Sequence, residues 1–480
     1  MENILRYNHK KDIFLFSGLF VLTVISVYYF PPALNKVFFL LLLVLCWFSK
    51  KNYFWLTLFI ILISGPLRLF EDYSGQAIHR IPAYDMIGKY GLSFNDLFLI
   101  LFFIKAKVKG IGNKLLLHNN YMILLALIVF LYICSFVYGF SGDNFIFYSR
   151  GLLFYTLFYS VPRLIRNEDI MFIFAIFIAV TLLSFSNQIL AVITGFDLAD
   201  TITGTNEIEQ LIVDVKYKRI LGSVLAQFFT FIFGLVMYSM TKSPIKKRYL
   251  LLIIMISYLS IFMTGTRGWI IAFSAVIIFY MLFLETQRSK ALISITIYLM
   301  LMLSITSFLP QIENLLGSNV ERVATIKKIA QGDLTAGGTL SRLTTKLPRL
   351  FEGIKQNPIL GWGFSDTFRY HSNGHVGWAN QILQMGMAGL LLFIIFWFNF
   401  WKFNVNLGKS FSLENPFKTS IAALNAGLLC LFIIHSTSRT MFNISMHHPM
   451  LVLVIMYFIF SDMWAKIGIE TEKNHKENIC

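Results

Sequence analysis

Residues 337–377 read GGTLSRLTTKLPRLFEGIKQNPILGWGFSDTFRYHSNGHVG, a polar and basic stretch that contrasts with the apolar sequence on both sides. The contrast extends over residues 311–377, in which the long apolar runs of the chain stop. A further apolar run follows His375, with Gly386 and Gly389 near its start. We therefore divide the chain into a membrane bundle at residues 1–310, a large loop at 311–377, and C-terminal membrane helices with a tail at 378–480.

The composition is that of an integral membrane protein. Of the 480 residues, 56% are hydrophobic and only 14% are charged, whereas about a quarter of the residues in a soluble domain are charged. The first apolar run, Ile13 to Phe30, is followed by Pro31-Pro32 rather than by a small-residue cleavage site, so we interpret it as a first span. The sequence predicts an all-α polytopic membrane protein.

The net charge of +16 favours contact with lipid over contact with nucleic acid. Basic loops set the topology of membrane proteins and bind anionic headgroups, and no basic block here is long enough to follow a phosphate backbone. We expect membrane lipids as partners and no nucleic acid. The four scattered cysteines lack metal-site spacing, so we expect no metal, and nothing in the sequence indicates a cofactor.

About fourteen apolar segments can be drawn, which predicts about 12–14 transmembrane helices. The segments near residues 37 and 92 are the weakest and could be partial or re-entrant. The approximate spans are 13–31, 37–49, 53–70, 92–106, 120–140, 147–163, 170–194, 220–241, 249–264, 268–286, 292–310, 378–402, 420–437 and 450–466.

The loops between these spans predict the topology. With the N-terminus inside, the short inner loops are consistently basic, as at Lys50-Lys51 and Lys242 to Arg248, which fits the positive-inside rule. Both termini are then cytoplasmic, and the long outer loops are 71–91, 195–219 and 311–377. Within the last loop, Ser341 to Gln356 has the spacing of an amphipathic helix that could lie on the outer membrane surface. Pro348 predicts a break or a second start within it.

Four arginines lie at or near the outer ends of spans: Arg150, Arg219, Arg267 and Arg342. Arg267 is the most informative, because Thr264 to Gly268 forms a short polar hinge between two apolar runs. Each arginine could be an interfacial anchor. Together they could hold a diphosphate without a metal, because each guanidinium donates two hydrogen bonds to one anion.

His375 is the candidate general base of the large loop, because the pKa of histidine lies near neutrality. His371 lies four residues away and competes for this role, and either side chain could simply be a hydrogen-bonded histidine at a loop end. Gly361 and Gly363 flank Trp362 and predict a tight turn with unusual backbone angles or the close approach of a ligand. Gly386 and Gly389 are interpreted as helix-packing glycines.

Three ordered blocks resemble the O-antigen ligase/O-antigen polymerase superfamily of bacterial envelope glycosyltransferases. The first is Thr266-Arg267-Gly268-Trp269. The second is Ser341-Arg342 followed by residues 357–363, which read NPILGWG. The third is His375 followed by residues 386–390, which read GMAGL. Two positions differ from the family pattern: Val376 replaces a common asparagine, and Lys346-Leu347 stands where a tryptophan is common.

The resemblance implies a bundle similar to the GT-C glycosyltransferases, with a large periplasmic loop that carries short amphipathic helices and the catalytic site. It implies a metal-independent, inverting transfer from an undecaprenyl-diphosphate-linked oligosaccharide at the outer face of the bacterial inner membrane. Arg267 and Arg342 would bind the diphosphate, and His375 would activate the acceptor hydroxyl. Arg219, Arg150, Gly361, Gly363 and His371 are further candidates for substrate binding.

Three activities remain open from the sequence. A polymerase would join the glycan to a sugar hydroxyl of another lipid-linked repeat unit, and a chain-length regulator would be a natural partner. A ligase would transfer the glycan to lipid A-core or another acceptor. A lipid-linked oligosaccharide flippase or transporter is less favoured, because such proteins place polar and charged groups near the membrane midplane. We favour the polymerase by analogy within the superfamily.

Overall fold

The computed structural model describes residues 10–64, 81–87, 90–110, 114–194, 196, 198–203, 210–212, 215–217, 223–264, 266–283, 341–372, 376–437 and 448–477. The predicted span at 292–310 and the first part of the large loop, residues 311–340, lie outside the described residues, as do Arg219 and His375.

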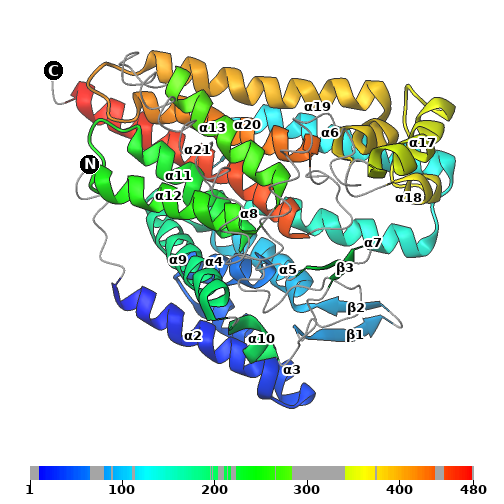
Figure 1. The fold of residues 1–480 in the computed structure, drawn as a ribbon, viewed down its shortest axis with the longest axis horizontal. Helices are drawn as coiled ribbons and strands as arrows, with labels where there is room; N and C mark the ends of the chain where they lie inside the picture. Colours follow the sequence, from blue (N-terminus) through cyan, green and yellow to red (C-terminus); the bar gives the residue numbers. More distant parts are fainter. Residues whose placement is uncertain are drawn as a thin grey trace.

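The chain is an all-α polytopic membrane protein, with two small hairpins added to the helices (Figure 1). Within the described residues, six helices are long and apolar enough to cross a membrane, and four shorter helices are also apolar. The six are α2 (Lys10–Tyr29), α6 (His118–Tyr138), α9 (Ile170–Thr194), α19 (Gly377–Ser410), α20 (Lys418–Thr437) and α21 (His448–Glu477). The four are α3 (Pro32–Phe48), α4 (Asn52–Ser64), α11 (Val224–Tyr238) and α13 (Arg267–Phe283).

The remaining helices and strands connect or extend this set. The helices are α5 (Phe94–Lys109), α7 (Gly142–Leu152), α8 (Leu157–Leu164), α10 (Leu198–Thr203), α12 (Lys247–Met263), α17 (Ser341–Gln356) and α18 (Asp366–His371). Strand β1 (Ala83–Ile87) pairs antiparallel with β2 (Tyr90–Ser93), and β3 (Gln210–Ile212) with β4 (Val215–Tyr217). Both hairpins fall in segments that the sequence predicts to be long outer loops.

The segments near 37 and 92, which the sequence marks as weak, form the regular helices α3 and α5. A buried lysine joins them, because Lys105 of α5 donates hydrogen bonds to the carbonyl oxygens of Cys46 (2.6 Å) and Ser49 (2.7 Å) at the end of α3. An ammonium group is favourable at a helix C-terminus, where unpaired carbonyl groups carry partial negative charge. The predicted span 147–163 is instead divided into α7, a 3₁₀ turn and α8.

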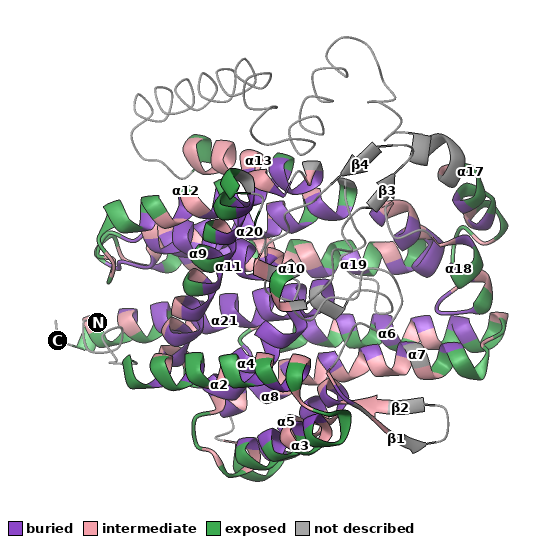
Figure 2. Cartoon of the chain, turned by 60° about the horizontal axis from the view of Figure 1, so that its bottom comes forward, coloured by how far each residue is buried: buried purple, intermediate pink, exposed green. Residues whose placement is uncertain are grey.

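The most apolar helices lie at the centre of the bundle. Helices α4 and α11 are buried over nearly their whole length, and so is the apolar part of α21, which runs through the purple interior in Figure 2. A helix that is apolar on all sides is stable only when other apolar groups surround it. The outer helices α2, α3 and α6 expose large apolar side chains instead, including Phe14, Phe48 and Val137, as expected of surfaces that face lipid.

Polar contacts show which helix ends lie together at each end of the bundle. At one end, the Asp12 carboxylate of α2 accepts hydrogen bonds from Lys51 (2.5 Å) and from the Tyr53 hydroxyl (2.7 Å) near the start of α4. At the other end, Trp378 at the start of α19 donates to the Ser436 hydroxyl (2.6 Å) at the end of α20. In Figure 1 the second end is on the right, where α17, α18 and both hairpins lie. The chain therefore crosses the bundle repeatedly, as the alternating loop assignment predicts.

The first hairpin is attached to the bundle by a tyrosine. The Tyr84 hydroxyl of β1 donates a hydrogen bond to the Lys36 carbonyl oxygen (2.9 Å), near the start of α3. Burial raises the pKa of Tyr84 to about 12, so the hydroxyl remains a donor at neutral pH. The hairpin is therefore fixed against the same end of the bundle that carries α17 and α18.

Candidate functional site

The long helix α19 is interrupted at Gly386, and a loop from the polar segment fills the interruption. Gly386 has φ 59° and ψ −171°, so the helix cannot continue through it. On one side of the break, the N–H groups of Met387 and Ala388 donate to the carbonyl oxygens of Pro358 (2.9 Å) and Ile359 (3.0 Å). Backbone groups that a helix break would leave unpaired are therefore satisfied by the loop.

The carbonyl oxygens on the other side of the break are satisfied in the same way. Leu383 accepts from the Trp362 N–H (3.0 Å) and Gln384 from the Gly363 N–H (2.7 Å). Four hydrogen bonds thus join the loop 357–364 to residues 383–388, and we call this unit the loop–helix junction. The junction brings residues 357–363, the NPILGWG block, against the segment that contains Gly386 and Gly389. Their interaction is backbone to backbone, and it leaves no room for side chains.

The glycines of the junction are required by this close contact. A Cβ atom on Gly386 would lie 2.1 Å from the Ile359 carbonyl oxygen, and one on Gly361 would lie 2.3 Å from the Gly386 nitrogen. Gly361 (φ 69°) and Gly363 (φ 59°) also have positive φ angles, which confirms the predicted unusual turn. The close approach is that of the chain's own backbone. The role of Gly361 and Gly363 in substrate binding stays a prediction.

The interpretation of Gly386 as a helix-packing residue is wrong, because Gly386 is the position at which the helix breaks. Gly389 does fit that interpretation. A Cβ atom on Gly389 would lie 3.2 Å from a methyl group of Leu127 in α6, so the missing side chain permits close packing of α19 on α6.

Helix α6 anchors the other side of the junction. A Cβ atom on Gly363 would lie 2.2 Å from the Leu131 carbonyl oxygen, so the loop backbone touches the α6 backbone. The Ser135 hydroxyl of α6 accepts a hydrogen bond from the Phe364 N–H (2.6 Å). The Trp362 indole donates to the Gly353 carbonyl oxygen of α17 (2.8 Å) and packs edge-on against Tyr138. The junction is therefore held between α6, α17 and α19.

Helix α17 has the predicted bounds, Ser341–Gln356, but differs from expectation in two ways. It runs through Pro348 without a break, because Pro348 lies on the exposed face, where the carbonyl group that it leaves unpaired can bind water. Part of its apolar stripe packs inside the protein: Leu350 is fully buried, whereas Phe351 is about half exposed. On the inward side, a Cβ atom on Gly353 would touch Leu383 and His371. This side packs on α18 and α19.

A carboxylate ties α18 to α7. The Asp366 side chain accepts hydrogen bonds from the Ser141 hydroxyl (2.8 Å) and from the Asn144 amide, and Asn144 in turn accepts from Arg369. These residues carry no catalytic motif, so sequence reasoning missed them. The local signals are the two helix caps, because Ser141 caps α7 and Ser365 caps α18.

Of the four predicted arginines, Arg267 and Arg342 are described by their backbone alone. Arg267 is the first residue of α13, and Arg342 is the second residue of α17. Arg267 therefore lies at the end of an apolar helix, as predicted, whereas Arg342 lies in the first turn of the amphipathic helix α17. Arg342 is on the same helix as Gly353, which contacts the junction. The predicted diphosphate-binding role of these two arginines, and the roles of Arg219 and His375, stay predictions.

Arg150 is engaged in an ion pair. Its Nη2 atom lies 2.6 Å from a carboxylate oxygen of Asp96, which is 1% exposed and caps the start of α5 together with Ser93. The buried Nε atom of Arg150 has no hydrogen-bond partner within the described residues. The geometry favours a structural role for Arg150, because its charge compensates a buried carboxylate.

His371 lies at the end of α18 and is buried. Its Nδ1–H donates to the Arg349 carbonyl oxygen of α17 (2.8 Å), and its ring packs edge-on against Tyr370. This is the hydrogen-bonded loop-end histidine that the sequence analysis considered as an alternative to a base. His371 therefore belongs to the packing between α17 and α18.

A family model described as O-antigen ligase matches residues 250–394, a segment that runs from α12 to the second half of α19 and includes the loop–helix junction. This match supports the resemblance of the chain to the O-antigen ligase/polymerase superfamily. A comparison with curated proteins finds no match. Within the described residues, no three His, Cys, Asp or Glu side chains are grouped as metal ligands.

The match supports an O-antigen ligase/polymerase type of function, with a lipid-linked oligosaccharide and an acceptor as the general substrate classes of the family. The matched residues contain all three sequence blocks that carry the resemblance. They also contain both partners of the junction, so the four backbone hydrogen bonds are a feature of the family domain of this chain.

Proposed function

We propose that this chain is a polysaccharide polymerase of the O-antigen ligase/polymerase superfamily. It transfers a glycan from undecaprenyl diphosphate to a sugar hydroxyl of another lipid-linked repeat unit, at the outer face of the bacterial inner membrane. The observation that carries the proposal is the family match over residues 250–394, which includes Arg267, Arg342 and His375. The junction supports it, because it fixes the backbone just before the segment that contains His375.

The reaction needs three groups in this proposal. The acceptor oxygen forms a bond to the anomeric carbon while the bond from that carbon to the diphosphate oxygen breaks, and the electron pair leaves with the diphosphate. Arg267 and Arg342 neutralise the charge that develops on the diphosphate, and His375 accepts the hydroxyl proton. Attack from the side opposite the leaving group inverts the anomeric configuration, and no step in this proposal uses a metal.

A ligase is the second candidate, and one observation favours it: the matched family is described as O-antigen ligase. The donor chemistry would be identical, and the acceptor would be lipid A-core or another molecule in place of a second repeat unit.

A transporter is less well supported. The polar side chains deep in the described helices bond to one another: the Ser260 hydroxyl of α12 donates to the Gln188 side chain of α9 (2.7 Å) and accepts from Gln227 of α11. Such side chains join neighbouring helices in membrane proteins. These side chains therefore form hydrogen bonds between helices, whereas a transport path needs polar groups that face a substrate.

The proposal is tested by Arg267→Ala in cells that lack the chromosomal gene. We expect long surface polysaccharide to disappear while the amount of protein in the membrane stays normal. Arg166→Ala is the matched control, because Arg166 is an exposed arginine whose ion pair with Glu168 (2.9 Å) lies in the α8–α9 connection, at the opposite end of the bundle. Normal polysaccharide in the Arg267→Ala strain would remove this residue from the site.

The same gel separates the candidate activities. A polymerase defect leaves single repeat units on the final lipid anchor, whereas a ligase defect leaves the anchor bare and accumulates polymer on the carrier lipid. Unaltered glycan after deletion of the gene would contradict both candidates.

A further inference from the structure

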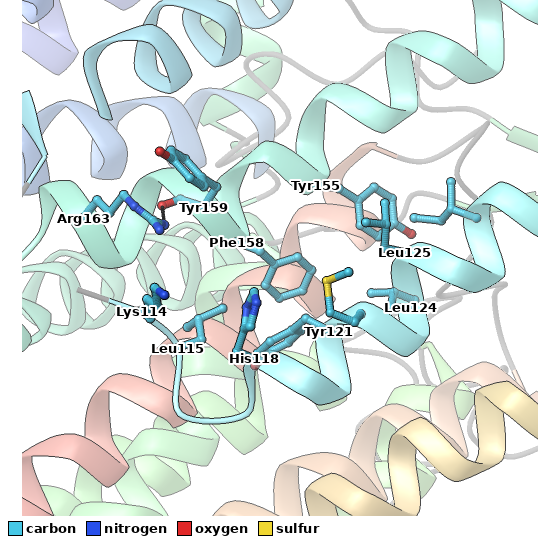
Figure 3. Close-up of a pocket in the computed structure, with 12 residues that line it drawn as sticks. Lys114, Leu115, His118, Tyr121, Leu124, Leu125, Tyr155, Phe158, Tyr159 and Arg163 are labelled. Atoms are coloured by element: carbon cyan, nitrogen blue, oxygen red, sulfur yellow. Dashed lines mark hydrogen bonds between the residues drawn. The ribbon is translucent and has the colours of Figure 1, made fainter. Parts of the chain in front are cut away.

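A cavity of about 230 Å³ lies between α6 and α8, at the end of the bundle opposite the loop–helix junction. Its lining comes from the start of α6, the segment that precedes it, and the α8 region (Figure 3). Nothing in the proposed glycan transfer uses this cavity, because the junction, Arg267 and Arg342 are at the other end. We propose that the cavity binds one anionic phospholipid of the surrounding membrane.

The cavity has two chemically different parts. Lys114, His118 and Arg163 line one part, and Figure 3 shows them on the side away from Leu124, Leu125 and Tyr155, which line the other. This separation of cationic and apolar groups matches the two parts of a phospholipid. A phosphate headgroup would contact the basic side chains, while the start of an acyl chain would lie along the apolar wall.

The Arg163 side chain and the backbone that carries Lys114 are held in place before any ligand binds. The Arg163 guanidinium stacks on the Tyr159 ring at 3.7 Å and donates to the Tyr159 carbonyl oxygen (3.0 Å). The segment that carries Lys114 is fixed by α21, because the Asp462 carboxylate accepts from the Leu116 N–H (2.7 Å) and Lys466 donates to the Lys114 carbonyl oxygen. Little ordering is therefore left for the ligand to impose.

The local charge is positive. Asp462, which accepts from the Leu116 N–H beside the basic part of the cavity, pairs with Lys466 (3.3 Å). Within the part of the chain that the structure describes, neither Lys114 nor Arg163 forms an ion pair with a carboxylate. These two cations can therefore attract an anion.

The position of the cavity favours a membrane lipid over a soluble anion. Met122 and Leu125 of its lining are about half exposed on the apolar helix α6, so this side opens where hydrocarbon surrounds the bundle. Lys114 and His118 lie at or just before the start of the same helix, and Arg163 lies in the last turn of α8. Headgroups are expected where the apolar run of such a helix begins. A soluble phosphate would use the cations but leave the apolar wall exposed.

The test is native mass spectrometry of the purified protein with phosphatidylglycerol or phosphatidylcholine. We expect the wild-type protein to retain one phosphatidylglycerol in preference to phosphatidylcholine. The double variant Lys114→Gln/Arg163→Gln should bind phosphatidylglycerol about thirty-fold more weakly, since each cation near a lipid surface contributes about 1 kcal/mol. Lys242→Gln/Lys246→Gln is the matched control, because both lysines are exposed at the same end but outside the cavity.

A second variant tests the apolar wall with the charges intact. Leu125→Trp fills the cavity and should weaken binding of the lipid, while inorganic phosphate at the same concentration should not compete with it. Equal retention of both lipids by the wild-type protein would overturn the proposal. So would unchanged phosphatidylglycerol binding by the double variant, or displacement of the lipid by phosphate alone.

Discussion

His371 and His375 lie four residues apart, yet the structure gives His371 a packing role. Its Nδ1–H bonds to the Arg349 carbonyl oxygen inside the contact between α17 and α18. We therefore expect His371→Asn, whose side-chain amide can donate the same hydrogen bond, to keep most of the glycan transfer activity. His375→Ala should lower the rate by roughly 10²–10⁴-fold, the usual contribution of a general base. Rates of transfer measured in isolated membranes check both expectations.

The outcome that would contradict this assignment is a folded but inactive His371→Asn protein. His371→Ala serves as the structural comparison, because it removes the hydrogen bond and should lower the free energy of unfolding by about 1 kcal/mol without abolishing transfer.

Arg150 is better explained by its carboxylate partner than by a substrate. Arg150→Gln leaves Asp96, which is 1% exposed, without its countercharge, so we expect the free energy of unfolding to fall by about 2 kcal/mol. This is less than for a fully buried pair, because the arginine side chain is 34% exposed. The double variant Asp96→Asn/Arg150→Gln should regain both stability and activity. Thermal unfolding in detergent and the transfer assay measure the two quantities.

A stable but inactive double variant would restore Arg150 to the list of residues that bind the donor. This double-mutant cycle therefore distinguishes a charge that stabilises the fold from a charge that binds the donor.

The element that organises the candidate site is the loop–helix junction. Alanine at Gly386 would place a Cβ atom 2.1 Å from the Ile359 carbonyl oxygen. It would also have to adopt φ 59° and ψ −171°, a backbone region essentially restricted to glycine, which alone costs roughly 1–3 kcal/mol. We expect Gly386→Ala to lower the unfolding temperature in detergent and to abolish transfer, because the loop can no longer pair with α19.

Gly142→Ala is the control for this substitution. Gly142 begins α7 at the same end of the molecule, and no atom lies within 4 Å of the Cβ position. Its unfolding temperature should equal that of the wild-type protein. An equal effect of both substitutions would show that the junction has no special importance.

The elements also show which features a sequence can predict. The spacing of the leucines in α17 is a local signal, and it predicts the helix bounds that the structure shows. The break at Gly386 was not predicted, because a glycine in an apolar run reads as helix packing. Its cause is the backbone of residues 358–363, more than twenty positions earlier in the chain. A periodicity argument does not detect such a partner.

The ion pair of Arg150 was missed for the same reason. Arg150 and Asp96 are separated by more than fifty residues and meet only when α5 packs beside α8 and the 3₁₀ turn that follows α7. Helix types and most bounds depend on local composition, whereas the partner of a buried charge depends on packing. The predicted similarity to the GT-C bundle, like the roles of Arg267, Arg342 and His375, also stays a prediction.

At the scale of the whole molecule, the two ends of the bundle carry different elements and different polar contacts. One end carries the hairpins, α17, α18 and the junction, and the other carries the polar clusters around Asp12, Lys105 and Asp462 (Figure 1). At the second end, Lys51 and Lys466 pair with carboxylates and Lys105 binds the C-terminus of α3, whereas Lys114 and Arg163 line the proposed lipid cavity. This distribution agrees with the proposal that the second end is cytoplasmic.

The orientation can be measured by cysteine labelling in intact cells. Cys46, Cys134 and Cys430 are buried, so a Cys480→Ser background should react little with a membrane-impermeant maleimide. Gly142→Cys lies at the end with the junction, and Lys242→Cys lies at the opposite end in the exposed turn between α11 and α12. If the junction faces outward, we expect the first variant to be labelled in intact cells and the second only after the membrane is permeabilised. The reverse order would place the junction in the cytoplasm, where a donor that is presented at the outer face could not reach it, and the proposed glycan transfer would fail with it.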